Sequence, residues 1–244
     1  KNYDPKKSYP LVMFIHDAGA TNDNVKNTLW QGNGATVWAS PEWQAKHPSF
    51  VLAPQFDHVI VNDKSDDPAD LDATINLIKS LSKEYSIDTK RLYATGQSGG
   101  AMMSIAMNIK YPDFFAASYI VAGQWAAEKT APMAKNKFFI LVSEDDPKAY
   151  PGQNAIVDVL AKHGAVVQKA VLTNGNATEA EHNAEVKALL AKEGNVHYMA
   201  VSSKTLPDQV NGINATSPGQ AHIGTWKISY NINAIREWLF AQSK

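Results

Sequence analysis

The sequence predicts an α/β fold with a mostly parallel central sheet and helices on both faces. Strand-like and helix-like segments alternate along most of the 244 residues, which is the order of βαβ units. The strand-like segments are continuous apolar runs, as expected of strands buried on both faces. No linker, repeat or low-complexity tract divides the chain. We therefore expect one domain over residues 1–244.

The predicted strands are short runs of apolar residues. The first, Leu11–Ile15, carries no polar side chain, which favours a position inside the sheet. We expect the strands, in chain order, over residues 11–15, 51–54, 91–95, 117–122, 138–142, 166–172 and 196–201.

The predicted helices lie between these strands. Asp67 and Pro68 offer an N-cap and a first-turn proline to a helix whose apolar residues recur with helical spacing. Thr178 and Glu181 form a capping box at the start of another. Further helices are expected over residues 101–110, 155–163 and 230–241, whereas residues 20–48 and 202–221 are predicted to be surface loops over one end of the sheet.

Composition excludes several kinds of function. The net charge is −1 and no long basic run occurs, so we expect neither a nucleic acid nor an anionic membrane surface as partner. The absence of cysteine excludes disulfides, thiolate metal sites and cysteine nucleophiles. No apolar run approaches the roughly 20 residues of a membrane-spanning helix.

One serine lies among glycines where a predicted strand meets a predicted helix. The segment Gly96-Gln-Ser98-Gly-Gly100 fits the pattern G-x-S-x-G of a nucleophile elbow, in which a sharp turn exposes the serine and its neighbours must be small. The N-terminal N–H groups of the following helix then face an oxyanion formed at the serine. The alternative is a glycine-rich turn with an incidental serine, and the strand–turn–helix context favours the nucleophile.

Three other segments that follow predicted strands or precede the last helix carry polar groups. The loop around His16 can supply a second backbone N–H donor, and the small Ala18 lets the backbone approach a substrate. Three acids, Glu144, Asp145 and Asp146, compete for the role of orienting a histidine. His222 is the favoured base because we expect it in a loop, whereas His182 and His197 lie in predicted regular elements. The order Ser98, Asp146, His222 is that of the α/β-hydrolase triad.

Metal and dinucleotide sites fit this sequence poorly. Asp63, Asp66, Asp67 and Asp70 are clustered but lack the glycine and terminal glutamate of a calcium loop. Gly32-Asn-Gly34 lacks the third glycine of a dinucleotide fingerprint. We expect no cofactor and no metal.

With these segments in order, the chain resembles α/β-hydrolase esterases of the polyhydroxybutyrate-depolymerase and feruloyl-esterase type, and in particular bacterial carboxylesterases with an immunoglobulin-like N-terminal domain. The most specific stretches are Ile87-Asp-Thr-Lys-Arg-Leu-Tyr-Ala-Thr-Gly-Gln-Ser98 and His222-Ile-Gly-Thr-Trp226. The family usually reads His-Gly where this chain has His16-Asp17, and often has Met where it has Gly99. The chain begins almost at the family's third strand, so we expect one or two N-terminal strands or a preceding domain to be missing or separate. A sheet without them has an open edge, where we expect an immunoglobulin-like domain or a partner chain to pair.

The resemblance implies Ser98 as nucleophile, His222 as base, Asp146 as acid, and Ala18 and Gly99 as oxyanion donors. We expect a serine carboxylesterase that favours short-chain acyl or aryl esters, with Trp125 and Trp226 as candidate pocket walls or, equally, core residues. The alternatives are a feruloyl or acetylxylan esterase, a polyester depolymerase, a peptidase or acyltransferase, and a non-catalytic polysaccharide-binding module. The substrate is a small or polymer-linked ester; the location stays open, with a secreted or periplasmic bacterial protein favoured.

Overall fold

Seven parallel strands form the central sheet of the computed structural model, which describes residues 3–207, 209–210, 213–214 and 218–244. Their order across the sheet is β2-β1-β3-β4-β5-β7-β6, and each neighbouring pair is parallel. This arrangement confirms the predicted parallel sheet. The strands are β1 (Tyr9–Ile15), β2 (Phe50–Leu52), β3 (Ile87–Gln97), β4 (Ala117–Val121), β5 (Phe138–Ser143), β6 (Val167–Leu172) and β7 (Val196–Val201).

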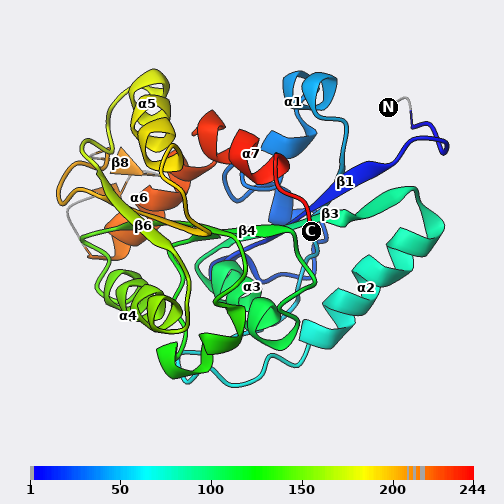
Figure 1. Ribbon diagram of the computed structural model, residues 1–244, viewed down its shortest axis with the longest axis horizontal. Helices are drawn as coiled ribbons and strands as arrows, with labels where there is room; N and C mark the ends of the chain where they lie inside the picture. The colour runs from blue at the N-terminus through cyan, green and yellow to red at the C-terminus, as the bar shows by residue number, and fades with distance from the viewer. Residues whose placement is uncertain (1–2, 208, 211–212, 215–217) are drawn as a thin grey trace.

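Helices cover both faces of the sheet, as predicted (Figure 1). On one face lie α2 (Leu71–Glu84), α3 (Gly99–Lys110) and α4 (Ala149–Lys162). On the other lie α1 (Pro41–Lys46), α5 (Glu179–Leu190) and α7 (Asn233–Phe240). Helix α6 (Pro218–Ser229) packs against β4 and β5, and β8 (Gln209–Val210) pairs with β9 (Ile213–Asn214) in a separate antiparallel ladder.

The burial of each strand follows its place in the sheet. All residues of β4, β5 and β7 are buried, because these strands have neighbours on both sides and helices on both faces. The edge strand β6 has only one neighbouring strand and leaves some of its side chains exposed. Phe14 of β1 is fully buried, and such a side chain contributes about 1.5–3 kcal/mol relative to an exposed one.

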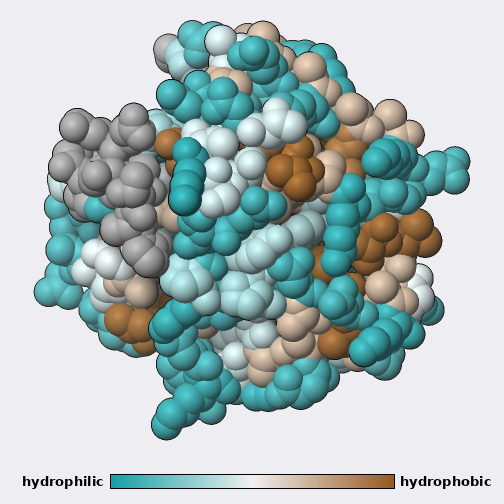
Figure 2. Space-filling view, turned by 90° about the vertical axis from the view of Figure 1, so that its left-hand side faces the viewer, coloured by the Kyte–Doolittle hydropathy of each residue, from teal (hydrophilic) through white to brown (hydrophobic). Residues whose placement is uncertain are grey.

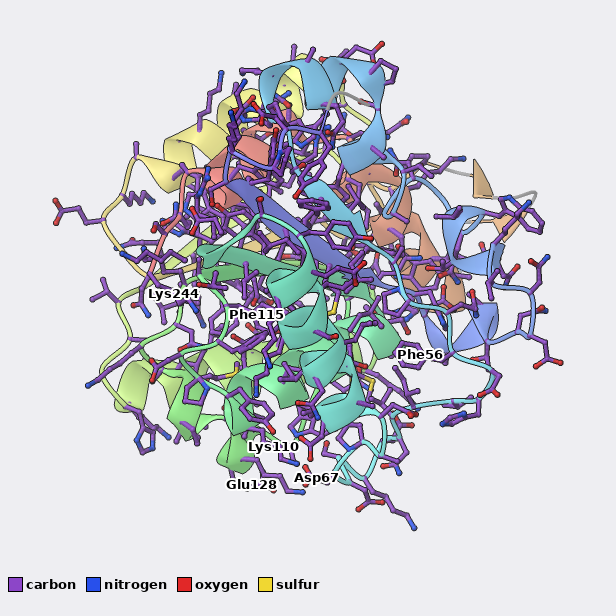
Figure 3. All side chains as sticks on the ribbon, turned by 90° about the vertical axis from the view of Figure 1, so that its right-hand side faces the viewer. Phe56, Asp67, Lys110, Phe115, Glu128 and Lys244 are labelled. Carbon is purple, nitrogen blue, oxygen red and sulfur yellow. The ribbon has the colours of Figure 1, made fainter. Side chains whose placement is uncertain are left out.

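The start of α2 differs from the prediction. The helix begins at Leu71 with Asp70 as its N-cap residue, not at Asp67 and Pro68. Pro68 instead begins a turn, in which its carbonyl accepts a hydrogen bond of 3.2 Å from the Leu71 N–H. Asp67 is exposed, and its carboxylate lies 3.9 Å from Lys110 Nζ at the end of α3 (Figure 3).

The two segments predicted as surface loops are partly regular and partly buried. Residues 20–48 contain α1 and short 3-10 turns, and Trp38 is fully buried, where its ring stacks on Phe240 of α7. The second segment leads into α6, which begins at Pro218 and contains His222. The loop prediction for His222 is therefore wrong. Apolar and small side chains of α6 are buried around most of its circumference, so its sequence lacks a simple amphipathic pattern.

The surface gives no sign of a large apolar area on the side shown in Figure 2. Apart from the grey residues, that side is mostly hydrophilic and its hydrophobic residues form small separate patches. Among the described residues, none of the helices is both long and apolar enough to cross a membrane.

Candidate active site

Ser98 occupies a sharp turn between β3 and α3. Its backbone has φ 52° and ψ −118°, a conformation that a residue with a side chain rarely adopts. The Ser98 N–H donates a 3.0 Å hydrogen bond to Val121 O of the neighbouring strand, which holds the turn in place. Such strain persists where the surrounding structure imposes it, and it is the backbone feature of a nucleophile elbow.

The flanking glycines allow this turn to pack closely. A Cβ atom on Gly100 would lie 1.9 Å from Ile15 O, and one on Gly96 would lie 2.5 Å from the Gly100 carbonyl carbon. The end of β1, the end of β3 and the start of α3 therefore meet with no room for side chains. This contact brings the loop after β1 next to Ser98.

His222 joins Ser98 to one acidic side chain. Its Nε2 lies 2.8 Å from Ser98 Oγ, and its Nδ1 forms a hydrogen bond with Asp146 Oδ2. A carboxylate only accepts, so the proton of the neutral ring is on Nδ1 and Nε2 accepts from the serine hydroxyl. This arrangement can move a proton from Ser98 to His222 while Asp146 stabilises the resulting imidazolium.

Of the three acids after β5, the structure brings only Asp146 to His222. The Asp146 side chain is 2% exposed, and its Oδ1 accepts hydrogen bonds from the N–H groups of Lys148 and Ala149, at 3.1 and 2.8 Å. Asp145 instead accepts from Ser203 Oγ and Lys204 N, at 2.5 and 2.6 Å. Glu144 accepts from Ser203 N at 2.9 Å. The carboxylates of Glu144 and Asp145 therefore link the turn after β5 to the segment after β7 by hydrogen bonds.

Ala18 and Gly99 lie against each other beside the serine. A Cβ on Gly99 would be 3.2 Å from Ala18 N and 3.4 Å from Val61 Cγ2. Gly99 is the first residue of α3, where N–H groups have no partner within the helix. The two backbone N–H groups predicted as oxyanion donors are thus adjacent, and any side chain on Gly99 would enter the space next to Ala18 N.

His16 supports the loop and does not reach the serine. Its Nε2 accepts a 3.0 Å hydrogen bond from the Phe56 N–H, so its Nδ1 carries the proton and donates to Asp17 O at 2.7 Å. The ring is 2% exposed and packs near Phe56, with 5.6 Å between ring centroids. Phe56 lies on the segment after β2 (Figure 3).

Asp17 is a buried acid that the sequence did not identify as part of the site. It is 4% exposed, and its Oδ1 accepts a 2.6 Å hydrogen bond from the Gly19 N–H. Burial raises the pKa of Asp17, and the hydrogen bonds from Gly19 and Gln97 and the nearby His222 oppose this shift. Its position directly after His16 was the available signal, since the family usually has glycine there.

A cavity of about 560 Å³ opens beside Ser98. Its wall contains both apolar and polar side chains. Among the polar side chains, Asp63 accepts hydrogen bonds from Lys148 Nζ at 2.5 Å and from Gln124 Nε2 at 3.0 Å. The hydrogen bond from Lys148 also lowers the pKa of Asp63. The described residues around the cavity are Ala18, Val61, Asn62, Asp63, Ser98, Gly99, Met102, Gln124, Asp146, Pro147, Lys148, Gly219 and His222.

The two tryptophans predicted as possible pocket walls lie outside this cavity. Trp125 is 6% exposed and lies beside Ala106 and Ile109 of α3 at a different, smaller pocket. Trp226 packs edge-on against the His222 ring, with 5.2 Å between centroids, from within the same helix. Trp125 belongs to the hydrophobic core, and the described contact of Trp226 near the site is with the His222 ring.

No metal site accompanies these groups within the described part of the chain. None of its clusters of three or more His, Asp or Glu side chains could hold a metal ion.

Known proteins are similar to this chain in sequence and in fold. The sequence profile of the family described as esterase PHB depolymerase matches residues 61–194, more than half of the chain. Probable acetylxylan esterase A of Aspergillus clavatus is 42% identical over 48 residues, covering 20% of this chain and 16% of that protein. Probable feruloyl esterase C of the same species is 28% identical over 180 residues, covering 71% of this chain and 58% of that protein.

A solved structure described as a thermostable esterase superposes on this chain with a TM-score of 0.78 and 27% identity, covering 100% of this chain and 57% of that one. The chain spans less than two thirds of the length of each of these three proteins. The superposition and the parallel sheet with helices on both faces confirm the predicted α/β-hydrolase fold. The profile match over residues 61–194 shows that the chain belongs to the esterase PHB depolymerase family.

Proposed function

We propose that the protein is a serine carboxylesterase. The observation that carries this proposal is the hydrogen-bonded series Ser98–His222–Asp146, with the serine in a strained turn at the wall of a cavity. The family, and the esterase activities for which the similar proteins are named, support the same class of reaction.

The proposed reaction has two steps. His222 takes the proton of Ser98 as its Oγ attacks the ester carbonyl carbon, and the tetrahedral oxyanion is stabilised by the N–H groups of Gly99 and Ala18. The alkoxide leaves with the proton from His222, which gives an acyl-enzyme. A water molecule, deprotonated by His222, then attacks the acyl-enzyme and releases the acid and free Ser98.

The cavity supports a small or polar ester. Val61, Met102 and Pro147 provide apolar surface for a short acyl or aryl group. Asn62 and the hydrogen-bonded side chains around Asp63 can bind hydroxyl groups. Esters attached to plant polysaccharides, such as feruloyl or acetyl groups on xylan, and polyhydroxyalkanoates are therefore the natural substrate classes that we propose to compare.

Hydrolysis of p-nitrophenyl acetate and butyrate tests the proposal directly. Ser98→Ala should lower kcat by about 10⁴- to 10⁶-fold, because the nucleophile and its base act as a unit. Ser80→Ala, an exposed serine on α2, is the matched control and should leave the rate unchanged. Equal rates for wild type and Ser98→Ala would overturn the mechanism.

A substrate panel separates the remaining alternatives. Methyl ferulate, acetylated xylan, 3-hydroxybutyrate oligomers, peptide anilides and an acyl acceptor with p-nitrophenyl acetate would distinguish the ester classes from a peptidase or an acyltransferase. A non-catalytic polysaccharide-binding module would bind xylan but hydrolyse none of these compounds.

A further inference from the structure

We propose that Asp17 is a positioning residue of the oxyanion hole, whose side chain fixes the turn that carries the Ala18 N–H. This inference rests on the proposed esterase function. The mechanism above assigns Asp17 no role, although its carboxyl group is buried directly behind the loop that faces Ser98.

The first observation is the hydrogen bond within the turn. Asp17 is the N-cap residue of the 3-10 turn Ala18–Ala20, and its Oδ1 accepts from the Gly19 N–H at 2.6 Å. Ala18 lies between the two residues that this bond connects, so the bond restricts the direction of the Ala18 N–H.

The second observation is the space at Gly19. A Cβ atom there would lie 2.9 Å from Asp17 Oδ1, a distance that real Cβ contacts do not show. The φ of Gly19 is not in the left-handed region, so the backbone does not itself require glycine. The carboxylate thus crowds the position that a Cβ atom on Gly19 would take.

The third observation is a contact with the strand that carries the nucleophile. Asp17 Oδ2 lies 3.4 Å from Nε2 of Gln97, which is 2% exposed and directly precedes Ser98. The backbone of Asp17 is held as well, since its N–H donates to Gln31 Oε1 at 3.0 Å and its carbonyl accepts from His16. One side chain therefore joins the donor loop to the turn of the nucleophile.

The test compares Asp17→Ala with Asp17→Asn on p-nitrophenyl acetate. Ala removes the acceptor for the Gly19 N–H, and we expect kcat to fall about 10- to 100-fold with KM within about threefold, because a misplaced donor acts on the transition state. In Asp17→Asn the side chain keeps an Oδ1 acceptor for the Gly19 N–H. The Gln97 amide can turn so that its Oε1 accepts from the Nδ2 of the new asparagine. We therefore expect Asn to restore kcat to within about threefold of wild type.

Asp67→Ala, which removes an exposed carboxylate outside the cavity, is the matched control. Thermal melting verifies that each variant folds, and the amide proton shift of Gly19 in NMR spectra should move upfield in Asp17→Ala but not in Asp17→Asn.

Two results would overturn the inference while leaving the proposed function intact. In the first, the wild type hydrolyses p-nitrophenyl acetate and Asp17→Ala has the same kcat. In the second, Asp17→Asn loses as much as Asp17→Ala, which would assign the effect to charge and not to the hydrogen bond. A wild type without esterase activity would overturn both proposals.

Discussion

Ser98 Oγ and His222 Nε2 lie 2.8 Å apart, although 124 residues separate them in the chain. Ser98 is held by the turn between β3 and α3, and His222 by a helix that packs against β4 and β5. The hydrogen bond therefore connects a strand–helix turn with a packed helix, and the imidazole does not come from a loop.

Gly99 should tolerate a side chain poorly because of where its Cβ would point. In Gly99→Ala the new methyl group would lie 3.2 Å from Ala18 N and partly fill the space of the oxyanion. We expect kcat for p-nitrophenyl acetate to fall about 10- to 100-fold. Gly219→Ala is the control within the same cavity, because a Cβ there meets no described atom within 4 Å. Similar kinetics for both variants would contradict the assignment of Gly99.

Asp146 and Asp145 differ in their partners and should differ in their effects. Asp146→Asn cannot hold the Nδ1–H tautomer of His222, so we expect a loss of about 10⁴-fold in kcat at neutral pH. Asp145→Asn changes only contacts with Ser203 and Lys204, and its kcat should stay within a few-fold of wild type. A larger loss from Asp145→Asn would refute the assignment of the acid.

The stability of the protein should depend on the charge of Asp17. Its pKa in the folded protein lies above the ordinary value of 3.8 because of burial. Between these two values the folded protein binds more protons than the unfolded chain, so stability falls as the pH rises through this window. Asp17→Asn should therefore have a higher Tm than wild type at pH 7. The difference should shrink as the pH is lowered toward 3.8.

Melting curves of both proteins between pH 4 and pH 8 measure this effect. In a domain of this size, Tm shifts by about 2–4 °C for each kcal/mol of change in the free energy of unfolding. A difference in Tm that grew at low pH would have the wrong sign and would reject the explanation by burial.

His16 should be needed for stability and not for proton transfer. In His16→Ala the Phe56 N–H loses its imidazole acceptor, and a buried donor left unpaired costs about 1–3 kcal/mol. The Asp17 carbonyl loses the bond from His16 but keeps the one from the Ala20 N–H. We expect a clearly lower Tm with an unchanged pH dependence of kcat/KM, because His222 remains the base. His163→Ala, an exposed histidine at the end of α4, should change neither quantity. A shifted pH profile in His16→Ala would show that His16 takes part in proton transfer.

Local sequence patterns predicted most of the strands correctly. Continuous apolar runs such as residues 138–142 are buried strands because a strand between two helical layers has no polar face. The capping box at Thr178 is present as predicted, since it depends on residues only three positions apart. The start of α2 was missed because Pro68 supports a preceding turn as readily as a first helical turn.

The helix that carries His222 shows where such patterns fail. Its residues are buried around most of the helix, so no polar face produces a helical period in the sequence. The loop argument that favours His222 over His182 and His197 does not hold, because His222 lies in a helix. Chain order and the resemblance still favour His222.

The sequence by itself determined the parallel α/β sheet, the strained turn at Ser98 and the order of the three polar segments, because each depends on neighbouring residues. Only the tertiary structure decided that Asp146 and not Asp145 faces His222, that Trp125 lies away from the cavity, and that Asp17 is buried behind Ala18. These facts depend on which strand ends are adjacent and on the paths of the loops between them. Residues far apart in the chain carry no local signal of the direction in which their side chains will meet.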